Sequence, residues 1–268
     1  MTTQVKLPTF KSKETKKNQY VLDGHTYYRV TSILNAINKP ALMPWKAQVT
    51  LDKANRVLSA LEGTSVTIDQ AWIDSVIETA RAEPDFVLDT ATTFGSNAHY
   101  ALEQYIANGV VPHDMDMFRV IGAFNSWAKS NQIELLPNMC EVTVAHSDGY
   151  AGTIDAVAIK GDELVIVDWK TSNGLYAEHM LQVSAYAKAL QLATGVPVNE
   201  AWIVRFPREK PEPGDSDFHW VHLGIKELNS NFDLFRAAQK LYVGTQLAAG
   251  QKVLHDGTGV LPEKKKKP

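Results

Sequence analysis

Two short apolar runs near the middle of the chain have the length and composition of β-strands. Residues 153–159 and 164–169 are rich in Ile and Val, and a Lys-Gly-Asp-Glu segment at 160–163 separates them. Gly and Asp at the centre of such a segment favour a two-residue hairpin loop. Because most residues of both runs are apolar on both faces, the pattern predicts a hairpin in the interior of a sheet.

Periodic apolar positions predict further elements along the chain, and Gly, Pro and capping residues indicate where these elements end. A smaller hairpin is expected around Asp23-Gly24, with Thr31 or Ser32 capping the next helix. One helix is predicted to begin at residue 33, and a separate helix is predicted to run to about residue 61. A helix at 69–81 should end at Pro84, and a helix that starts at 90–103 should end at Gly109. Further helices are predicted at 118–131, with Phe118 on the apolar stripe, at 177–195 and at 228–250. Further strands are predicted at 141–144, 201–206 and 220–223.

Acidic residues interrupt the apolar pattern of the central hairpin. If residues 161–162 form the loop, the register sets Asp155 directly opposite Asp168. Lys170 projects from the same face about 7 Å further along, opposite Thr153. Two facing carboxylates in an apolar setting repel and lose hydration, whereas a divalent cation between them reverses the sign of that energy. The pattern therefore predicts a hydrolytic metal site, with Lys170 placed to orient a water. The alternative is a surface salt bridge, which is what most Asp-x-Lys pairs form.

These residues resemble the motifs of the PD-(D/E)XK nuclease superfamily, and specifically its RecB-like exonuclease branch. The matching residues are Asp155 for the first acid, Asp168-Trp169-Lys170 for the (D/E)-x-K element with Asp as an allowed variant, and Gln182 to Tyr186 for the Q-x-x-x-Y helix. The resemblance implies Mg²⁺- or Mn²⁺-dependent cleavage of DNA phosphodiester bonds. It also implies an α/β (α+β) fold in which a central mixed β-sheet flanked by helices forms a restriction-endonuclease-like core.

The same resemblance implies a set of metal ligands. The pattern Gly-x-x-x-His-x-x-x-Glu at residues 95–103 is similar to a RecB-like helix whose histidine, here His99, binds the metal. Glu103 lies on the same helix face and is either a further ligand or the partner that orients the imidazole. The implied ligands of one or two Mg²⁺ or Mn²⁺ ions are His99, Asp155, Asp168 and the main-chain carbonyl of Trp169.

Three further residues are candidates for supporting roles in the site. Glu141 occupies the place where relatives often have another acid, and an edge-strand charge is the alternative. Gln182 and Tyr186 share a helix face that points back toward Lys170. The amide could hold a phosphate or the lysine, whereas for Tyr186 a packing role in the core is equally open.

Five residues are candidate DNA contacts: Lys39, Trp45, Thr171, Ser172 and Arg205. Trp45 could stack on a base, but packing of a helix start onto the core is the favoured alternative. For Arg205, a surface charge is favoured in the same way.

Composition narrows the class of protein. The 268 residues are 44% hydrophobic, which is ample for a core. The only cysteine, Cys140, rules out both a disulfide framework and the four-cysteine iron–sulfur cluster of some relatives. A formal net charge of −3 leaves any nucleic-acid surface to local basic residues. Because no signal-peptide core or membrane-spanning apolar run is present, a cytoplasmic protein is expected.

Four regions are expected: a basic N-terminal arm at 1–19, a hairpin and helical cap at 20–90, the nuclease core at 91–256 and a disordered Lys-rich tail at 257–268. The resemblance favours an exonuclease of phage or bacterial recombination, repair or replication, acting on DNA ends, alone or with a protein partner. An inactive nuclease-like protein that binds DNA or a partner is the main alternative. An unrelated α/β enzyme is a third interpretation, although the chain has no phosphate-cradling glycine loop.

Overall fold

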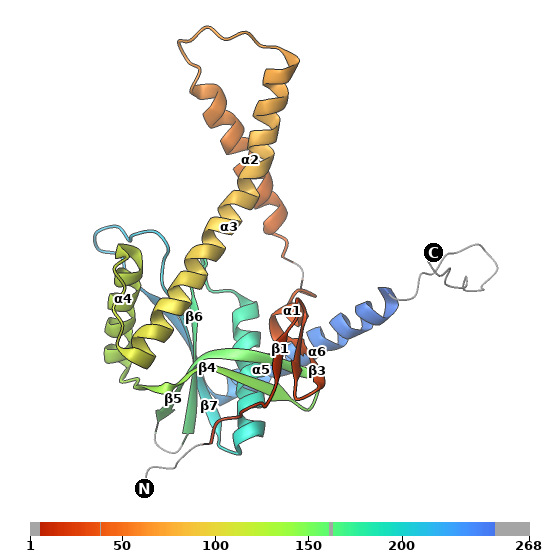
Figure 1. Ribbon diagram of the computed structural model, residues 1–268, viewed down its shortest axis with the longest axis vertical. Coiled ribbons are helices and arrows are strands. Elements are labelled where there is room, and N and C mark those ends of the chain that lie inside the picture. Colours follow the sequence, from red (N-terminus) through yellow and green to blue (C-terminus); the bar gives the residue numbers. More distant parts are fainter. Residues whose placement is uncertain (1–5, 38, 161–162, 250–268) are drawn as a thin grey trace, which may run out of the picture.

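The computed structural model describes residues 6–37, 39–160 and 163–249, and it consists of one mixed sheet with helices on both faces (Figure 1). The eight strands of the sheet are β1 (Lys13–Thr15), β2 (Gln19–Leu22), β3 (His25–Arg29), β4 (Leu135–His146), β5 (Tyr150–Lys160), β6 (Glu163–Lys170), β7 (Val198–Arg205) and β8 (His219–Leu223). The helices in the described residues are α1 (Val30–Leu34), α2 (Leu42–Ser59), α3 (Gln70–Asn108), α4 (Met115–Asn131), α5 (Ala177–Thr194) and α6 (Ile225–Ala249). The predicted class, α/β (α+β) with a central mixed sheet flanked by helices, is confirmed.

The central hairpin has the predicted register. β5 and β6 pair antiparallel from Lys160↔Glu163 to Ala156↔Val167. The predicted loop at 161–162 lies outside the described residues. β4 covers the other edge of β5, so the order across the sheet is β1-β2-β3-β5-β6-β7-β8 with β4 paired to β5.

Beyond that register the two central strands part. β6 continues in parallel beside β7 as far as the Lys170↔Arg205 pair. Further along β5, the same edge pairs with β3 instead of β6, through Tyr28. A fork therefore opens in the sheet, and Asp155 and Asp168 are the first residues beyond the last paired position.

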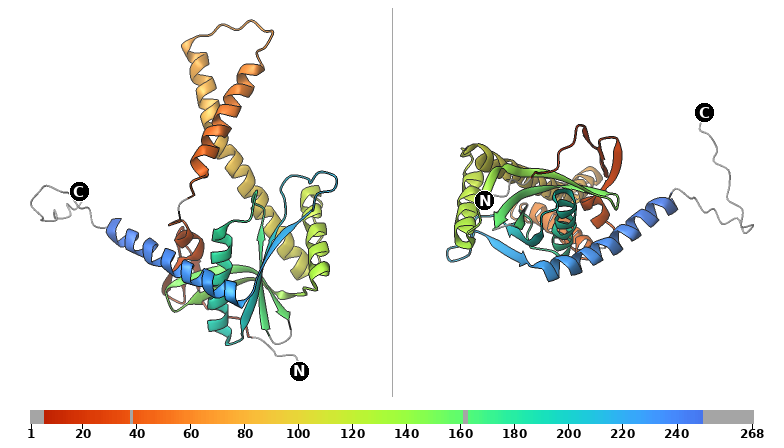
Figure 2. Two further views of the ribbon diagram at one scale, coloured as in Figure 1. Left: turned by 180° about the vertical axis from the view of Figure 1, so that it is seen from behind. Right: turned by 90° about the horizontal axis from the view of Figure 1, so that it is seen from below.

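Helices cover both faces of the sheet (Figure 2), and a separate hydrophobic core lies on each face. α5, α6 and α1 pack on one face, where Val157 and Ile166 meet Val183 and Leu190 of α5. α4 and the second half of α3 pack on the other face over a cluster of aromatic side chains, comprising Phe124, Trp127, Trp169, Trp202 and Phe206. Alternate residues of β5 and β6 enter opposite cores, which explains why both faces of these strands are apolar.

α3 is one continuous helix of 39 residues, so the prediction of two helices separated at Pro84 is wrong. Its start and end follow ordinary capping rules: the Asp69 carboxylate accepts a hydrogen bond from the Trp72 N–H at 2.8 Å, and Gly109 ends the helix with φ +67°. Pro84 removes one intrahelical hydrogen bond, but it is buried, and packing of α3 on α2 and on the sheet keeps the helix intact. The boundary expected at 90–91 falls inside this helix.

α2 and the first half of α3 form a helical arm that projects away from the sheet (Figure 1). Ion pairs join the two helices, with Lys46 3.0 Å from Asp85 and Lys53 2.9 Å from Glu83. No residue of α2 is buried, whereas the central strands are almost wholly buried. The arm lies largely within residues 20–90, the range in which the sequence leads us to expect a helical cap.

The N-terminal hairpin is confirmed, but the helix after it begins earlier than predicted. Asp23 and Gly24 form the turn with φ +49° and +82°, the conformation that a type I′ hairpin requires. α1 then begins three residues before the expected start, with Arg29 at its N-cap and no side-chain cap. Neither Thr31 nor Ser32 therefore has the predicted capping role.

Two further predictions need correction. Part of the expected solvated arm folds onto the sheet as β1, where the Lys13 ammonium donates a hydrogen bond to Thr143 Oγ1 at 2.6 Å. Phe118 does not lie on the buried stripe of α4; it is 54% exposed, because Met117, Ile121 and Phe124 face the sheet instead. The predicted tail at 257–268 lies outside the described residues. Across residues 6–37, 39–160 and 163–249, no helix has the length and apolarity needed to cross a membrane.

Candidate metal centre and active site

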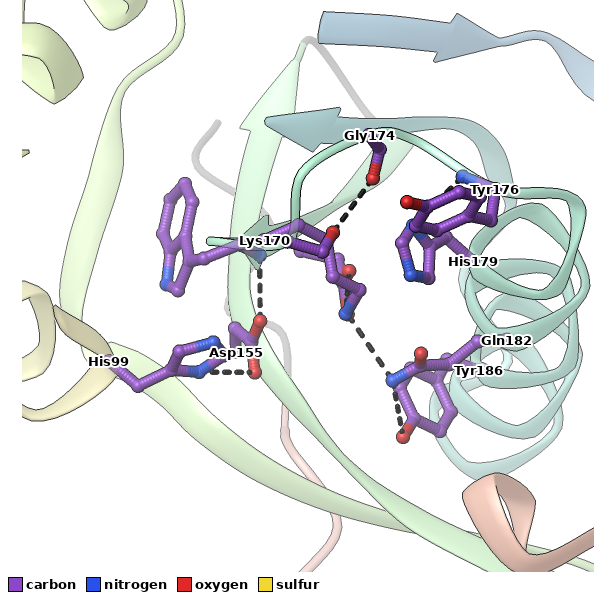
Figure 3. A network of polar contacts seen from close by, with 11 residues as sticks. His99, Asp155, Lys170, Gly174, Tyr176, His179, Gln182 and Tyr186 are labelled. Atoms are coloured by element: carbon purple, nitrogen blue, oxygen red, sulfur yellow. Dashed lines mark hydrogen bonds and ion pairs between the residues drawn. The ribbon is translucent and has the colours of Figure 1, made fainter. Parts of the chain in front are cut away.

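At the fork, the side chain of Asp155 on β5 bonds to the backbone of β6 instead of pairing with Asp168. Its Oδ2 accepts a hydrogen bond from the Trp169 N–H at 2.7 Å, and its Oδ1 lies 3.3 Å from Nδ1 of His99 on α3 (Figure 3). Asp168 instead meets Gln182 of α5. The predicted direct pairing of the two acids is therefore wrong: the β5–β6 pairing ends at Ala156↔Val167, one position before them, and each carboxylate has other partners.

Glu141 joins Asp155 and His99 in a compact group. Each residue offers one ligand atom, and these atoms lie within 4.8 Å of one another. Glu141 has φ +52°, which is rare for a residue with a long side chain. It falls between the pairs that Cys140 and Val142 make with β5, just after the register shift between Leu135 and Cys140. Such backbone conformations are concentrated at functional sites.

Asp168 and Lys170 form a buried ion pair on the other side of the fork. The Lys170 ammonium lies 2.5 Å from Oδ2 of Asp168, whose side chain is only 1% exposed. Burial lowers the pKa of Lys170, but the carboxylates of Asp168 and Asp155 raise it more strongly, so the ammonium stays charged. Because one cation responds to both acids, the two halves of the site are electrostatically one cluster.

Gln182 and Tyr186 extend this cluster along α5. Gln182 Nε2 is 3.4 Å from Asp168 Oδ1 and 3.1 Å from the Tyr186 hydroxyl. Tyr186 packs against the backbone of Gly152, where an added Cβ would lie 2.3 Å from a ring carbon of Tyr186. The glycine is required there by this close approach, not by its backbone angles.

The acids of the cluster differ in how readily they ionise. Burial raises the pKa of Asp155, but His99, Lys170 and the Trp169 N–H lower it to below its usual range. Burial raises the pKa of Asp168 to about 6 despite Lys170. Partial burial and the nearby Asp155 carboxylate raise the pKa of Glu141 to about 7, although the residue is open to solvent.

The donor set fits a divalent cation. Three carboxylates and one imidazole surround the fork with a single lysine to offset them, and a hard cation would relieve their mutual repulsion. Oδ2 of Asp168 is buried without a hydrogen bond in suitable geometry, even though Lys170 lies beside it. A buried acceptor in that condition is a natural ligand atom. The residues that could hold the ion are His99, Glu141 and Asp155, with Asp168 across the fork.

An open groove of about 590 Å³ leads to the cluster along α3. Its walls carry hydroxyl and small side chains from α3 and from the loop after β6, and it ends at His99; the lining residues are Leu88, Ala91, Thr92, Gly95, Ser96, His99, Thr171 and Ser172. α3 and that loop approach closely, since a Cβ on Gly95 would lie 3.0 Å from Thr171 Oγ1. Thr171 and Ser172 therefore line the approach to the site.

The other predicted site residues lie further from the fork or are held by other groups. Lys39 forms an ion pair with Glu178 at 3.1 Å, and Arg205 Nε donates to the carbonyl of Ser172 at 2.6 Å. Trp45 lies half-buried in α2. Glu103 stands close enough to Cys140 and Glu141 to raise the pKa of both groups, and His99 directs its Nδ1 to Asp155.

Sequence reasoning missed two residues at the site, His179 and Gly152 in its packing role. His179 is the third residue of α5, and its Nδ1 accepts the Tyr176 N–H at 3.2 Å. Its signal in the sequence was its position, three residues before Gln182 on one helix face. The contact of Gly152 with Tyr186 joins elements far apart in the chain and left no local signal.

No protein-family model and no curated protein matches the sequence. Among solved structures, the chain is similar to an alkaline exonuclease from Laribacter hongkongensis, with 11% identity over 84% of this chain and 94% of that chain and a TM-score of 0.34. The complex of that enzyme with dAMP gives the same identity and coverage with a TM-score of 0.36. A phage-related exonuclease from Haemophilus somnus is 13% identical over 57% of this chain and 82% of that chain, with a TM-score of 0.28. At this level of similarity, function has to be argued from the site.

Proposed function

We propose that this protein is a Mg²⁺- or Mn²⁺-dependent deoxyribonuclease that hydrolyses phosphodiester bonds. The observation that carries the proposal is the convergence of His99, Glu141, Asp155 and Asp168 with Lys170 at one fork in the sheet. Uncompensated acids in such a setting destabilise a fold, so their presence together is typical of a metal site. A divalent cation there would supply Lewis-acid stabilisation of negative charge on a phosphate oxygen.

Residues of this chain would orient the reactants. Lys170 is charged and held by Asp168, so it can donate hydrogen bonds to an attacking water and offset charge that develops on the phosphate. Gln182 holds the second oxygen of Asp168 and limits its rotation. Asp155 is fixed by the Trp169 N–H and His99. The main-chain carbonyl of Trp169 remains part of the proposed ligand set. Rigid positioning of this kind is a large source of rate enhancement.

The groove along α3 supports DNA as the substrate. Its size is in the range of small-molecule sites, and hydroxyl groups of Ser96, Thr171 and Ser172 suit a phosphate backbone. We assign an exonuclease because the His99 helix and the Gln182–Tyr186 helix resemble those of end-processing RecB-like nucleases. Action on phage or bacterial DNA in recombination, repair or replication, in the cytoplasm and with a protein partner, belongs to the same proposal.

A cleavage assay tests the proposal. Purified protein is incubated with end-labelled single- and double-stranded DNA in Mn²⁺, Mg²⁺ or EDTA, and parallel substrates carry blocked 5′ or 3′ ends. We expect cleavage in either metal, none in EDTA, and inhibition by blocking one end. Cleavage of a fully blocked or circular substrate would replace the exonuclease assignment with an endonuclease.

The assay also decides the main alternative. Protein that binds DNA but leaves it intact in both metals would be a nuclease-like binding protein. The Asp155, Asp168 and Lys170 set favours the enzyme, because binding alone needs no buried cluster of acids.

A further inference from the structure

His179 lies on the face of α5 that lines the candidate active site. Residues 179, 182 and 186 are spaced at i, i+3 and i+7, so their side chains follow one stripe of the helix. Gln182 and Tyr186 on this stripe already reach toward Asp168. His179 continues the stripe by one turn, and its ring faces the Lys170 side chain (Figure 3).

One nitrogen of the His179 ring is committed to the helix start. Nδ1 accepts a hydrogen bond from the Tyr176 N–H at 3.2 Å, which is half of a capping box. The Tyr176 ring packs edge-on against the imidazole, with centroids 5.5 Å apart and an interplanar angle of 68°. The Lys39–Glu178 ion pair holds the same turn of α5. The ring orientation is therefore fixed before any ligand arrives.

The proton of the neutral ring must then be on the other nitrogen. An imidazole whose Nδ1 accepts a hydrogen bond carries its hydrogen on Nε2. Burial, and then the Lys170 ammonium, lower the pKa of His179 to about 4, so the ring is neutral at pH 7. Within the described part of the chain, Nε2 has no hydrogen-bond partner. A neutral donor without a partner is thus held beside a catalytic lysine.

We propose that His179 is a substrate-binding residue whose Nε2–H donates a hydrogen bond to a non-bridging phosphate oxygen of DNA beside Lys170. This inference rests on the proposed nuclease function, and it adds a phosphate-binding role for a residue outside the acid, acid, lysine set. A neutral donor suits this position because it binds the phosphate without competing with Lys170 for the Asp168 carboxylate. The competing explanation is that His179 only caps α5.

Two substitutions separate the phosphate contact from the cap. In His179→Asn, the amide oxygen takes the place of Nδ1 and keeps the cap, but no donor reaches the site. In His179→Gln, an N–H can occupy the place of Nε2. His113→Asn is the matched control, because His113 is exposed and lies outside the site.

The first measurement is the single-turnover cleavage rate in Mn²⁺, with thermal unfolding recorded for each variant. We expect His179→Asn to unfold at the wild-type temperature but to cleave about 10- to 100-fold more slowly, the range expected for one hydrogen bond to a charged group. His179→Gln should recover most of the rate, and His113→Asn should be unchanged. A wild-type rate in His179→Asn, with wild-type protein active, overturns this inference alone.

The second measurement does not depend on cleavage. Binding of a labelled oligonucleotide to Lys170→Met protein is compared with and without His179→Asn, and weaker binding in the double variant is expected. Imidazole nitrogen NMR should show the Nε2–H tautomer of His179, whereas an Nδ1–H tautomer contradicts the proposal. Wild-type protein that neither cleaves nor binds DNA would overturn the proposed function and this inference together.

Discussion

Asp155 and Asp168 have the same side chain and lie at the same fork, yet their surroundings differ. Asp155 accepts a backbone N–H and faces the imidazole of His99, and its pKa is lowered. Asp168 is almost fully buried, is paired with Lys170, and has its pKa raised to about 6. Asp155 is thus ionised by its own fixed partners, whereas the charge of Asp168 depends on one ammonium.

Under the proposed function, the difference would give the two sides of the fork distinct tasks. The α3 side gathers oxygen and nitrogen donors, which suits a cation. The α5 side holds a lysine and a chain of hydrogen bonds, which suits alignment of water and phosphate. Substitutions on the α5 side should therefore change the rate at saturating metal, and substitutions on the α3 side should change the metal requirement.

The largest effect is expected for Lys170→Met. Removal of the ammonium takes away the group that offsets charge on the phosphate, so single-turnover cleavage should fall about 10²- to 10³-fold even at saturating Mn²⁺. Lys160→Met is the matched control, since Lys160 pairs with Glu200 on the exposed surface. Full activity in Lys170→Met would show that the α5 side has no catalytic task.

His99→Ala should have the next largest effect, on the metal requirement. Loss of the imidazole removes a ligand and a partner of Asp155, and changes around metal ligands typically cost about 10- to 100-fold in affinity or activity. A titration of cleavage against Mn²⁺ concentration measures the shift. If excess Mn²⁺ leaves the defect unchanged, His99 acts on the rate and the division between the two sides is wrong.

Gly152→Ala should damage the α5 side through packing. The new methyl group would collide with Tyr186 and move Gln182 away from Asp168. Overpacking of this kind costs about 1–3 kcal/mol of unfolding free energy, and cleavage should fall as well. Urea unfolding measures the cost. In a Tyr186→Ala background, the same substitution should be almost neutral, because the collision is gone; additive losses would contradict the contact.

Glu141→Gln should have the smallest effect, seen best without metal. The folded state raises the pKa of Glu141 to about 7 from an ordinary 4.5, so the folded protein holds this proton more tightly and loses stability as pH rises from about 4.5 through 7. The glutamine side chain does not titrate, so the variant does not lose stability over this pH range. In EDTA, its melting temperature should match the wild type near pH 5 and exceed it near pH 8. An equal gap at both values would argue against a shifted Glu141.

Much of the fold was readable from local patterns. Asp23-Gly24, the alternation in β5 and β6, and Gly109 and Gly195 at helix ends each act over a few residues. The predicted helix end at Pro84 was wrong because packing along both halves of α3 outweighs the free-energy cost of a proline inside a helix. No local sequence pattern records that packing. The predicted burial of Phe118 was wrong for a similar reason, since helical spacing does not fix which stripe of the helix packs on the sheet.

The sequence by itself determined the chemistry of the site: which acids, which lysine, and the hairpin register that brings them near each other. The tertiary structure decided how they are arranged. Extending the register predicts a direct pair of Asp155 and Asp168, but the β5–β6 pairing ends at Ala156↔Val167, β3 pairs with β5 further along, and Asp155 turns to the Trp169 N–H and His99. Strand separation depends on competition between neighbouring strands far apart in the chain, so only the assembled sheet fixes it.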